Sequence, residues 1–522
     1  MKRATKELLN IHVKGIKCAK DLDALKRSLA KKYKIGILLN SEILKEYRKQ
    51  VKNKKIERNL SLENILKKRA IRTMSGVAPV AVLTKPYPCP GNCAYCPNEK
   101  NVPVSYLSNE PAVMRAIRCS YKPYRQTQDR LRALEANGHD PRKIELIVMG
   151  GTWSFLPLNY RYLYIANCFK AANDYPRERE EIKNVSNIST LKSILKKEQK
   201  RNETTKYKII GLTLETRPDY IDKEELLLMR EMGCTRVEMG VQALSDKILK
   251  LNKRGHGVLE ITEATKLLRR YGFKITYHFM PALPGSSTTL DFKMFNKMFN
   301  DSRFQPDQIK FYPTVVVKGS LLYSWWKQGK YKPYTDKQLK NLIIKCKKIV
   351  PKYVRIIRLI RDIPGESIEA GNKITNLRQI IQDAGVVCSC IRCREARDRK
   401  IPDKLITEII NYTASGGEEF FISFTDVNKK VLYGFARLRI DKNSPIAQSI
   451  IRELHVYGQL VYKGSEKKIQ HAGLGKKLMA MAEDIALKNN CKNIAVISGV
   501  GVRGYYRKLG YRLKNTYLFK QF

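Results

Sequence analysis

Short apolar runs alternate with amphipathic segments across the middle of the chain, and this alternation restricts its fold more than any other feature. The runs have the length of strands, and the segments between them space their apolar residues as helices do. Such alternation is typical of a parallel sheet whose strands are joined by helices. We therefore predict an α/β fold with a partial TIM-type (β/α) barrel over residues 75–365. Its strands are expected at Lys143–Met149, Lys208–Leu214, Arg236–Gly240, Lys274–Phe279 and Gln308–Tyr312.

Cys89, Cys93 and Cys96 follow the apolar run Val80–Leu83, which has the character of a buried strand. The C-x3-C-x2-C loop would then lie at the C-terminal mouth of the barrel, where barrel enzymes carry their chemistry. Three thiolates can hold a 4Fe-4S cluster and leave one iron free for a ligand. Zinc with a distant fourth ligand and redox-active thiols are the alternatives. The preceding strand and Tyr95 favour the cluster, and the spacing resembles that of radical S-adenosylmethionine (AdoMet) enzymes.

Glycines and polar groups follow three further strands of the predicted barrel. They are Gly150, Gly151, Glu215, Arg217, Glu238 and Gln242. Glycines let the backbone approach a ligand closely. Buried charges are costly unless a ligand or a structural ion pair uses them, and both interpretations stay open. His278 is more often a satisfied core residue than a ligand, and the basic loop Lys253–His256 suits either a phosphate contact or a solvated turn.

Cys388, Cys390 and Cys393 form a second group of thiols. We predict a structural zinc clip here, because zinc accepts thiolates tetrahedrally and needs no redox chemistry. A fourth ligand is not evident, and a second cluster or free or disulfide-forming thiols are the alternatives. Six of the 12 cysteines fall into the two groups, which favours metal binding in a reducing compartment. We find neither a membrane-spanning apolar run nor a secretion signal and expect a cytoplasmic protein.

Positive charge dominates the composition, with 100 Lys and Arg against 49 Asp and Glu. Such an excess favours a polyanionic partner through counterion release, although an AT-rich genome or solvated charged faces would also raise it. Residues 1–70 carry 21 basic and 7 acidic residues at helical spacing, so we predict a basic helical region over residues 1–74. The charged stretch 181–206 is expected to be a flexible solvated excursion.

The pattern changes again after residue 402, where antiparallel strands are expected at Glu419–Phe424, Val431–Ile440 and Ile451–Tyr457. The stretch Gln470, His471, Ala472, Gly473, Leu474 and Gly475 follows, at the head of a predicted helix over Lys476–Ala486. Glycines at a helix head expose N–H groups to a pyrophosphate. This order resembles the acetyl-CoA-binding core of the GNAT acyltransferases, an α+β fold. We place that domain at residues 402–522 and a zinc-binding linker at 366–401.

A radical AdoMet barrel joined to a GNAT domain resembles the catalytic subunit of Elongator, a tRNA-modifying family. The strings that carry the resemblance are Ser75–Val82, Glu110–Arg118, Val148–Thr152, Glu238–Gln242, Arg452–Gly458 and Ile497–Gly501. Many relatives have a longer gap between the first two cysteines, and eukaryotic members generally lack the second group. The longer gap casts little doubt on cluster binding, and the second cysteine group suggests a bacterial- or archaeal-type member that does not require other Elongator subunits.

The resemblance implies carboxymethylation of C5 of the wobble uridine in the tRNA anticodon stem-loop. In the family's mechanism, a 5′-deoxyadenosyl radical takes hydrogen from acetyl-CoA, and the resulting carbon radical adds to uracil. By resemblance, Gly150, Gly151, Glu238 and Gln242 bind AdoMet, Glu215 and Arg217 are catalytic, and Tyr505 and Tyr506 serve acetyl-CoA use. Gln470, His471, Gly473 and Gly475 bind acetyl-CoA. The resemblance also implies a reducing electron donor as a partner, and a homodimer is one assembly that it allows.

Two rival hypotheses remain. The first is a protein lysine acetyltransferase with an iron–sulfur domain, although a strongly basic chain would repel a basic histone-like substrate. The second is a tRNA-binding scaffold whose cluster is structural. Separately, the alternative to an acetyl-CoA role for Tyr505 and Tyr506 is that either side chain merely packs in the core.

Overall fold

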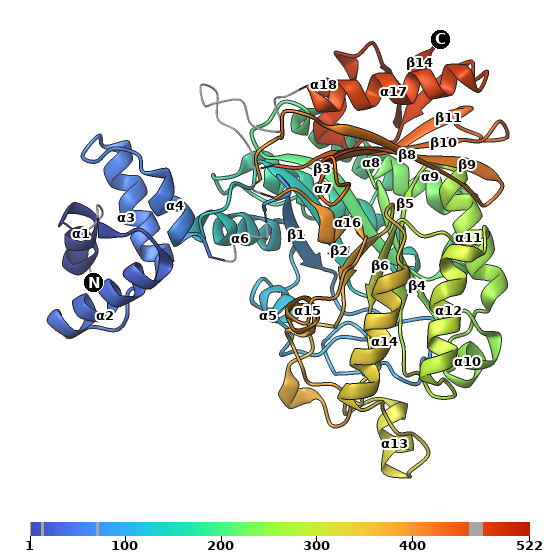
Figure 1. Cartoon of the computed structure of the whole chain (residues 1–522), viewed down its shortest axis with the longest axis horizontal. Helices are drawn as coiled ribbons and strands as arrows, with labels where there is room; N and C mark the ends of the chain where they lie inside the picture. The colour runs from blue at the N-terminus through green and yellow to red at the C-terminus, as the bar shows by residue number, and fades with distance from the viewer. Residues whose placement is uncertain (1, 12–14, 69–72, 398, 459–472) are drawn as a thin grey trace.

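The structure is a computed structural model that describes residues 2–11, 15–68, 73–397, 399–458 and 473–522. Figure 1 shows a small N-terminal lobe standing beside a larger body. The lobe consists of α1 (Lys2–Ile11), α2 (Ala19–Lys32), α3 (Asn40–Lys52) and α4 (Leu60–Leu66). It has a hydrophobic core of its own, with Leu8, Leu29 and Tyr47 among the buried members. The N-terminal region is therefore helical, as predicted from its periodicity.

The first sheet of the body is parallel, and its strands lie in sequence order. They are β1 (Ala78–Leu83), β2 (Lys143–Met149), β3 (Lys208–Thr216), β4 (Arg236–Gln242), β5 (Lys274–Phe279), β6 (Gln308–Phe311) and β7 (Arg355–Arg358). The helices between them are α5 (Pro111–Arg118), α6 (Pro123–Ala136), α7 (Leu158–Asp174), α8 (Ile188–Asn202), α9 (Lys223–Glu231), α10 (Asp246–Leu251), α11 (Val258–Arg270), α12 (Thr288–Asn300), α13 (Leu321–Lys327) and α14 (Asp336–Ile349). Because α6 packs on β1, α7 on β3 and α11 on β5, the helices cover one face of a partial barrel. The predicted fold class is confirmed.

Side-chain alternation along these strands determines which face is apolar. In β2, Ile144, Leu146 and Val148 are buried in the hydrophobic core, whereas Glu145 and Ile147 line an internal cavity. Successive side chains of a strand point to opposite faces. The helix-covered face therefore supplies the core, and the opposite face is available for chemistry.

The segment 181–206 does not form the flexible excursion expected from its charge. It contains α8, whose Leu191 and Leu195 are fully buried beside α7. Asn173 of α7 donates hydrogen bonds to the backbone oxygen and the carboxylate of Glu198 at 2.9 and 2.7 Å. Apolar residues at i and i+4 among the lysines give the helix one buried face, which the count of charged residues conceals.

The second sheet has the order β13-β14-β12-β11-β10-β9-β8 and lies against the open side of the first. Its strands are β8 (Ile406–Ala414), β9 (Gly417–Thr425), β10 (Leu432–Ile440), β11 (Ser449–Val456), β12 (Asn493–Val496), β13 (Arg512–Lys514) and β14 (Tyr517–Gln521). Helices α17 (Leu474–Lys488) and α18 (Arg503–Arg507) complete this part, and α15 (Leu377–Asp383) and α16 (Ile391–Arg394) lie before it. The mixed sheet with a covering helix is the α+β arrangement expected for residues 402–522.

Two close contacts fix the second sheet on the first. Arg452 of β11 donates to Asp307, which precedes β6, with Nη2 to Oδ1 at 2.6 Å and Nη1 to Oδ2 at 2.8 Å. The 3-10 turn η7 (Val500–Val502) packs on β3. A Cβ added to Gly499 would lie only 2.0 Å from the carbonyl oxygen of Ile210. The two sheets therefore form one body.

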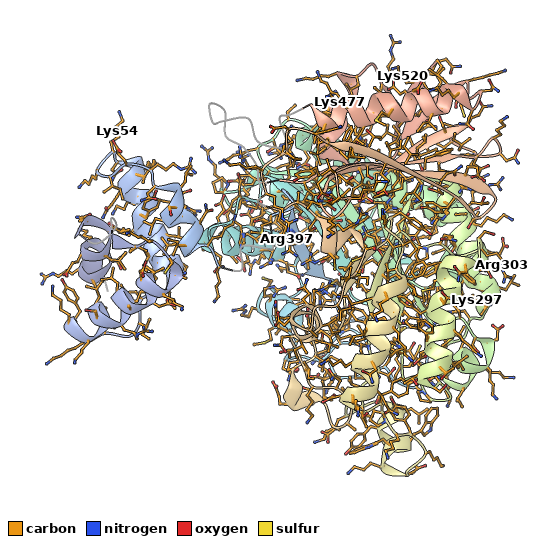
Figure 2. All side chains as sticks on the ribbon, in the orientation of Figure 1. Lys54, Lys297, Arg303, Arg397, Lys477 and Lys520 are labelled. Atoms are coloured by element: carbon orange, nitrogen blue, oxygen red, sulfur yellow. The ribbon has the colours of Figure 1, made fainter. Side chains whose placement is uncertain are left out.

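Basic side chains are spread over the lobe and both sheets. Figure 2 marks Lys54 on the N-terminal lobe, Lys297 on the barrel and Lys477 on the second sheet's helix. Basic side chains thus occur on the lobe and on both sheets of the body. Within the described residues, we find no helix with both the length and the apolarity that crossing a membrane requires.

Candidate active site between the two sheets

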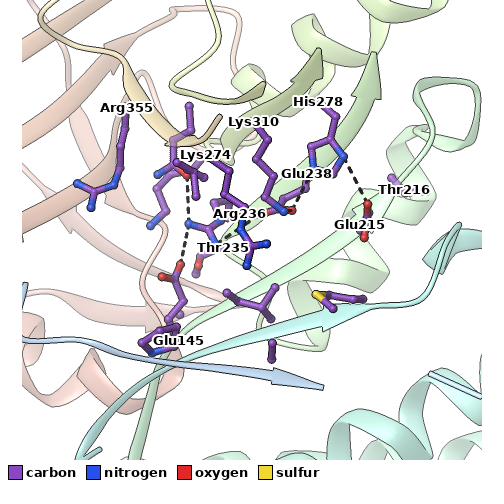
Figure 3. Close-up of a pocket in the computed structure, with 18 of the residues that line it drawn as sticks. Glu145, Glu215, Thr216, Thr235, Arg236, Glu238, Lys274, His278, Lys310 and Arg355 are labelled. Carbon is purple, nitrogen blue, oxygen red and sulfur yellow. Dashed lines mark hydrogen bonds and ion pairs between the residues drawn. The ribbon is translucent and has the colours of Figure 1, made fainter. Parts of the chain in front are cut away.

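A single cavity of about 1160 Å³ lies between the two sheets. The barrel contributes alternate residues of its strands, and the second sheet contributes residues of β10, β11 and the turn after β12. Figure 3 shows a close-up of a pocket lined by charged side chains from the barrel strands. The first three cysteines, Tyr505 and Tyr506 all line this cavity, although more than 400 residues separate them in sequence. Both predicted centres of chemistry therefore open into one space.

The loop with Cys89, Cys93 and Cys96 forms one end of the cavity. The Ala94 N–H donates to the Asn252 carbonyl at 3.1 Å, which ties the loop to the segment after β4. A hydrogen bond from Cys96, with the Arg254 guanidinium, lowers the pKa of Cys93 to about 4 although burial opposes this. A thiolate is the form that binds metal. The same hydrogen bond, together with burial, raises the pKa of Cys96 well above its usual range. Three thiols on one loop are a donor set that fits an iron–sulfur cluster.

Polar atoms without partners surround this loop. Arg217 donates from Nε and Nη2 to Asp219 at 2.9 and 2.7 Å, and its Nη1 is buried with no hydrogen-bond partner. The Oε1 atom of Gln242 is also buried and unpartnered, on a backbone with φ of 66°. Burying such atoms is costly unless something satisfies them. A polar ligand such as AdoMet fits this wall.

The two predicted glycines lie on the same wall with different roles. Both have positive φ, 131° at Gly150 and 98° at Gly151. A Cβ at Gly150 would lie 2.0 Å from Thr84 Oγ1, whereas Gly151 lines the cavity itself. Gly150 therefore lets β1 and β2 approach, and Gly151 is the one that offers backbone to a ligand.

A chain of charged groups crosses the barrel face of the cavity (Figure 3). His278 lies between two carboxylates, with Nε2 3.1 Å from Glu238 Oε2 and Nδ1 3.4 Å from Glu215 Oε1. Lys310 pairs with Glu238, and Tyr106 donates its hydroxyl to Glu215 at 3.1 Å. Burial alone would raise the pKa of Glu238, but Lys310 and His278 hold it well below its usual range. Glu238 is thus a buried ion-pair partner that also lines the cavity.

Sequence patterns assigned no role to His278, although its position along the strand could have indicated that it lines the cavity. Lys274 and His278 are four residues apart along β5, so they share one face, and both line the cavity. Arg254 of the basic loop also lines it and donates from Nη1 to Cys93 Sγ at 3.2 Å. The burial of this arginine contradicts the solvated turn that was one alternative for the loop. The loop turns a buried side chain toward the cysteines.

The second sheet opens where the cavity begins. β11 and β12 pair in parallel only from Ser449 to Ile451, and the residues beyond line the cavity. Tyr505 has a buried hydroxyl without a partner, and a Cβ at Gly475 would lie 2.9 Å from it. Gly473 caps α17 with φ of 74°. Gln470 and His471 lie outside the described residues. A splayed strand pair beside a helix head leaves room for a thioester and its carrier.

The second cysteine group is compact. The sulfurs of Cys388, Cys390 and Cys393 all lie within 4.8 Å of one another, which no other trio of His, Cys, Asp or Glu does in the part of the chain described. Ile391, between them, donates its N–H to Val354 O at 2.9 Å. Three mutually close thiols suit a single soft ion such as zinc. A fourth ligand does not appear among the described residues.

A parallel half-barrel with an open three-cysteine loop, joined to a splayed acetyltransferase-like sheet, defines a radical SAM–GNAT protein. Family models agree: the Radical SAM superfamily matches residues 87–288, the Radical_SAM C-terminal domain 306–384 and the Acetyltransferase (GNAT) family 390–511. The chain is 44% identical to tRNA uridine(34) acetyltransferase of Dehalococcoides mccartyi, over 87% of this chain and 99% of that protein. It is 37% identical to human Elongator complex protein 3, over 99% and 95%.

A solved structure gives the same result. Archaeal Methanocaldococcus infernus Elp3 with an N-terminal deletion superposes with a TM-score of 0.73 at 38% identity, covering 86% of this chain and 99% of that one. The protein belongs to the family of Elongator complex protein 3 and the tRNA uridine(34) acetyltransferases.

Proposed function

We propose that the protein carboxymethylates C5 of the wobble uridine of tRNA, with AdoMet as radical source and acetyl-CoA as carbon donor. The shared cavity carries this proposal. It places the cysteine loop and the tyrosines of the acetyltransferase sheet around one space, as a reaction that uses both cofactors requires. The names of the relatives, which refer to uridine 34 of tRNA, support the same substrate.

When bound, the cluster would supply the electron that cleaves AdoMet to a 5′-deoxyadenosyl radical. We assign AdoMet to the wall formed by Gly151, Arg217 and Gln242, whose unpartnered polar atoms match its amino and carboxylate groups. Glu215 lies beside this wall and hydrogen bonds to Tyr106. These side chains would orient the cofactor, because their positions are already fixed by neighbouring strands.

On the opposite side, Tyr505, Tyr506 and the glycines at the head of α17 would hold acetyl-CoA. Tyr505 lines the cavity and its buried hydroxyl has no hydrogen-bond partner, so it would be free to donate to the thioester carbonyl. Gln470 and His471 are assigned to the same pocket by their place in the sequence. The acetyltransferase sheet would thus present the acetyl methyl group to the radical and not transfer acetyl to an amine.

The nucleic acid would reach the cavity through its cationic wall. Arg355, Arg358 and Arg361 line it, and each is within 4.0 Å of a carboxylate. Arg392 also lines it, and no Asp or Glu lies within that distance of it among the residues described. We assign Arg392 to an RNA phosphate and residues 1–74 to further tRNA contacts. A flipped base would then enter between the sheets.

Anaerobic reconstitution tests the proposal. The full chain is loaded with iron and sulfide and incubated with AdoMet, acetyl-CoA, a one-electron reductant and tRNA, and the nucleosides are analysed by mass spectrometry. We expect carboxymethyluridine that requires every component. Acetylated protein without modified uridine would identify a lysine acetyltransferase instead, and tRNA binding without either product would identify a scaffold.

A further inference from the structure

Arg254 is a buried cation that has no carboxylate partner. It is 7% exposed and makes two side-chain hydrogen bonds, from Nη1 to Cys93 Sγ at 3.2 Å and from Nη2 to Gly240 O at 2.6 Å. Within the described part of the chain, no Asp or Glu oxygen lies within 4.0 Å of it. Among the described residues, the Cys93 sulfur is therefore the one side-chain partner of Arg254 that can carry a negative charge.

Arg217, on the same wall, provides the contrast. It is equally buried, but Asp219 neutralises it with two hydrogen bonds. Glycines make room for both guanidinium groups: a Cβ at Gly91 would lie 2.0 Å from Arg217 Nη1, and a Cβ at Gly240 would lie 2.4 Å from Arg254 Nη2. The fold therefore accommodates two cations beside the cysteine loop and leaves only Arg254 uncompensated.

An uncompensated buried charge is costly unless an anion faces it. Three thiolates around a 4Fe-4S core carry net negative charge, which increases by one when the core accepts an electron. Positive charge and hydrogen bonds to the sulfurs raise the reduction potential of such clusters. Arg254 supplies a positive charge and a hydrogen bond to the sulfur of one cysteine, Cys93. Its position thus favours the state with the additional electron.

We propose that Arg254 is a positioning residue that fixes the Cys93 thiolate and raises the reduction potential of the cluster, an inference that rests on the cluster assigned under the proposed function. A low-potential one-electron donor is oxidised by one electron and the cluster is reduced by one. No bond to the protein forms or breaks, and Arg254 keeps its proton. The guanidinium stabilises the added charge without taking part in the chemistry of the substrate.

The neighbouring residue offers a matched control. Lys253 lies on the same loop and carries the same charge, but its side chain is exposed. Lys253→Gln therefore removes one positive charge that solvent already screens. Arg254→Lys keeps the charge but loses the forked geometry that reaches both Cys93 and Gly240. Arg254→Gln loses the charge and keeps a hydrogen-bond donor.

Each full-length variant is reconstituted anaerobically, its iron and sulfide are measured, and its midpoint potential is determined by redox titration followed by electron paramagnetic resonance. For Arg254→Gln we expect at least tenfold less reduced cluster at a fixed potential, equivalent to about 59 mV for a one-electron couple. Arg254→Lys should fall between Arg254→Gln and wild type. Lys253→Gln should titrate as wild type.

A wild-type midpoint for Arg254→Gln at wild-type iron content would overturn the inference. If Arg254→Gln retains no cluster, the decision falls to Arg254→Lys: a lowered midpoint supports the inference, and an unchanged one overturns it. An equal shift in Lys253→Gln would also overturn it, because the effect would then be one of overall charge. A wild-type chain that binds no cluster would overturn the proposed function and this inference together.

Discussion

Arg452 of the second sheet and Asp307 of the first are joined by two hydrogen bonds, of 2.6 and 2.8 Å, with both side chains inaccessible to solvent. Glu419 accepts from the same arginine at 2.8 and 3.0 Å. Arg269 and Arg439 also pair with Glu419, and Arg437 lies 3.5 Å from Asp307. Burying an ion pair costs desolvation free energy. Removing one member leaves the other charge buried without a partner, and this destabilises the fold strongly.

We expect Asp307→Asn to lower the free energy of unfolding by about 3–5 kcal/mol, because it leaves the buried Arg452 without its closest charge partner. Chemical denaturation followed by circular dichroism measures the loss. Asp484→Asn is the control, since Asp484 pairs with Lys488 on the exposed face of α17 and should change stability by less than about 1 kcal/mol. Equal effects of the two substitutions would show that the buried group does not stabilise the body.

Acid should weaken the same junction. Burial alone would raise the pKa of Asp307, but Arg452 and Arg269 hold it well below its usual range. Burial is likewise outweighed at Glu453, whose pKa Lys274 and Arg437 lower to about 2. Both carboxyls have lower pKa values folded than unfolded, so their contribution is complete above the unfolded value of about 4 and is lost as pH falls.

We therefore expect the free energy of unfolding to decrease between about pH 4 and pH 2, with a smaller decrease in Asp307→Asn than in wild type. Urea titrations at several pH values measure this slope. A variant that loses as much stability as wild type over this range would indicate that other carboxyls control the acid transition.

Gly499→Ala should disturb the docking of η7 on β3, since the new Cβ would meet the Ile210 carbonyl oxygen. Overpacking of this kind costs about 1–3 kcal/mol. Gly504→Ala is the matched control, because no atom lies within 4 Å of a Cβ placed there, and its position in α18 favours alanine. Differential scanning calorimetry measures the melting temperature of each variant. A melting temperature for Gly499→Ala equal to or above that of Gly504→Ala would contradict the contact.

Cys390→Ser should remove one bound metal ion per chain and lower the thermal stability, because it takes one thiolate from a group of three. Elemental analysis of the purified protein gives the stoichiometry. The iron of the first group should be retained, since Cys89, Cys93 and Cys96 lie on a different loop. A wild-type zinc content in the variant would disprove the clip.

Tyr505→Phe should weaken acetyl-CoA binding about tenfold, because it removes the buried hydroxyl assigned to the thioester. Isothermal titration calorimetry measures the affinity. Tyr511→Phe, whose hydroxyl donates to Glu483 at 2.7 Å, should bind acetyl-CoA as wild type does. Unchanged binding in Tyr505→Phe would place the thioester elsewhere in the cavity.

Periodicity predicted the strands well where burial is regular. The expected strands Lys143–Met149 and Lys274–Phe279 coincide with β2 and β5. Burial alternates along β2, whereas β5 is buried along nearly all of its length, and a short run of strand length marks both in the sequence. The helix α8 was missed, since its lysines outnumber the few apolar residues that bury it. Local composition thus fails where a narrow apolar face is enough for packing.

The candidate site was predictable only in part, because spacing identifies ligands that are close in sequence. Cys89, Cys93 and Cys96 are recognisable within one loop. Arg254 reaches Cys93 across 161 residues, and that contact depends on how β4 and its following loop fold back. The shared cavity could not be predicted for the same reason, since it forms only when the second sheet lies across the open face of the first.

The shared cavity also bears on how the chain can be divided. Its lining alternates with core residues along β2, and β11 and the turn after β12 provide the facing wall. A fragment ending before β8 would expose polar strand faces and Asp307 to water, and the complementary fragment would expose Arg452 and Glu419. We therefore expect a cut between the two sheets to destabilise both halves of the chain.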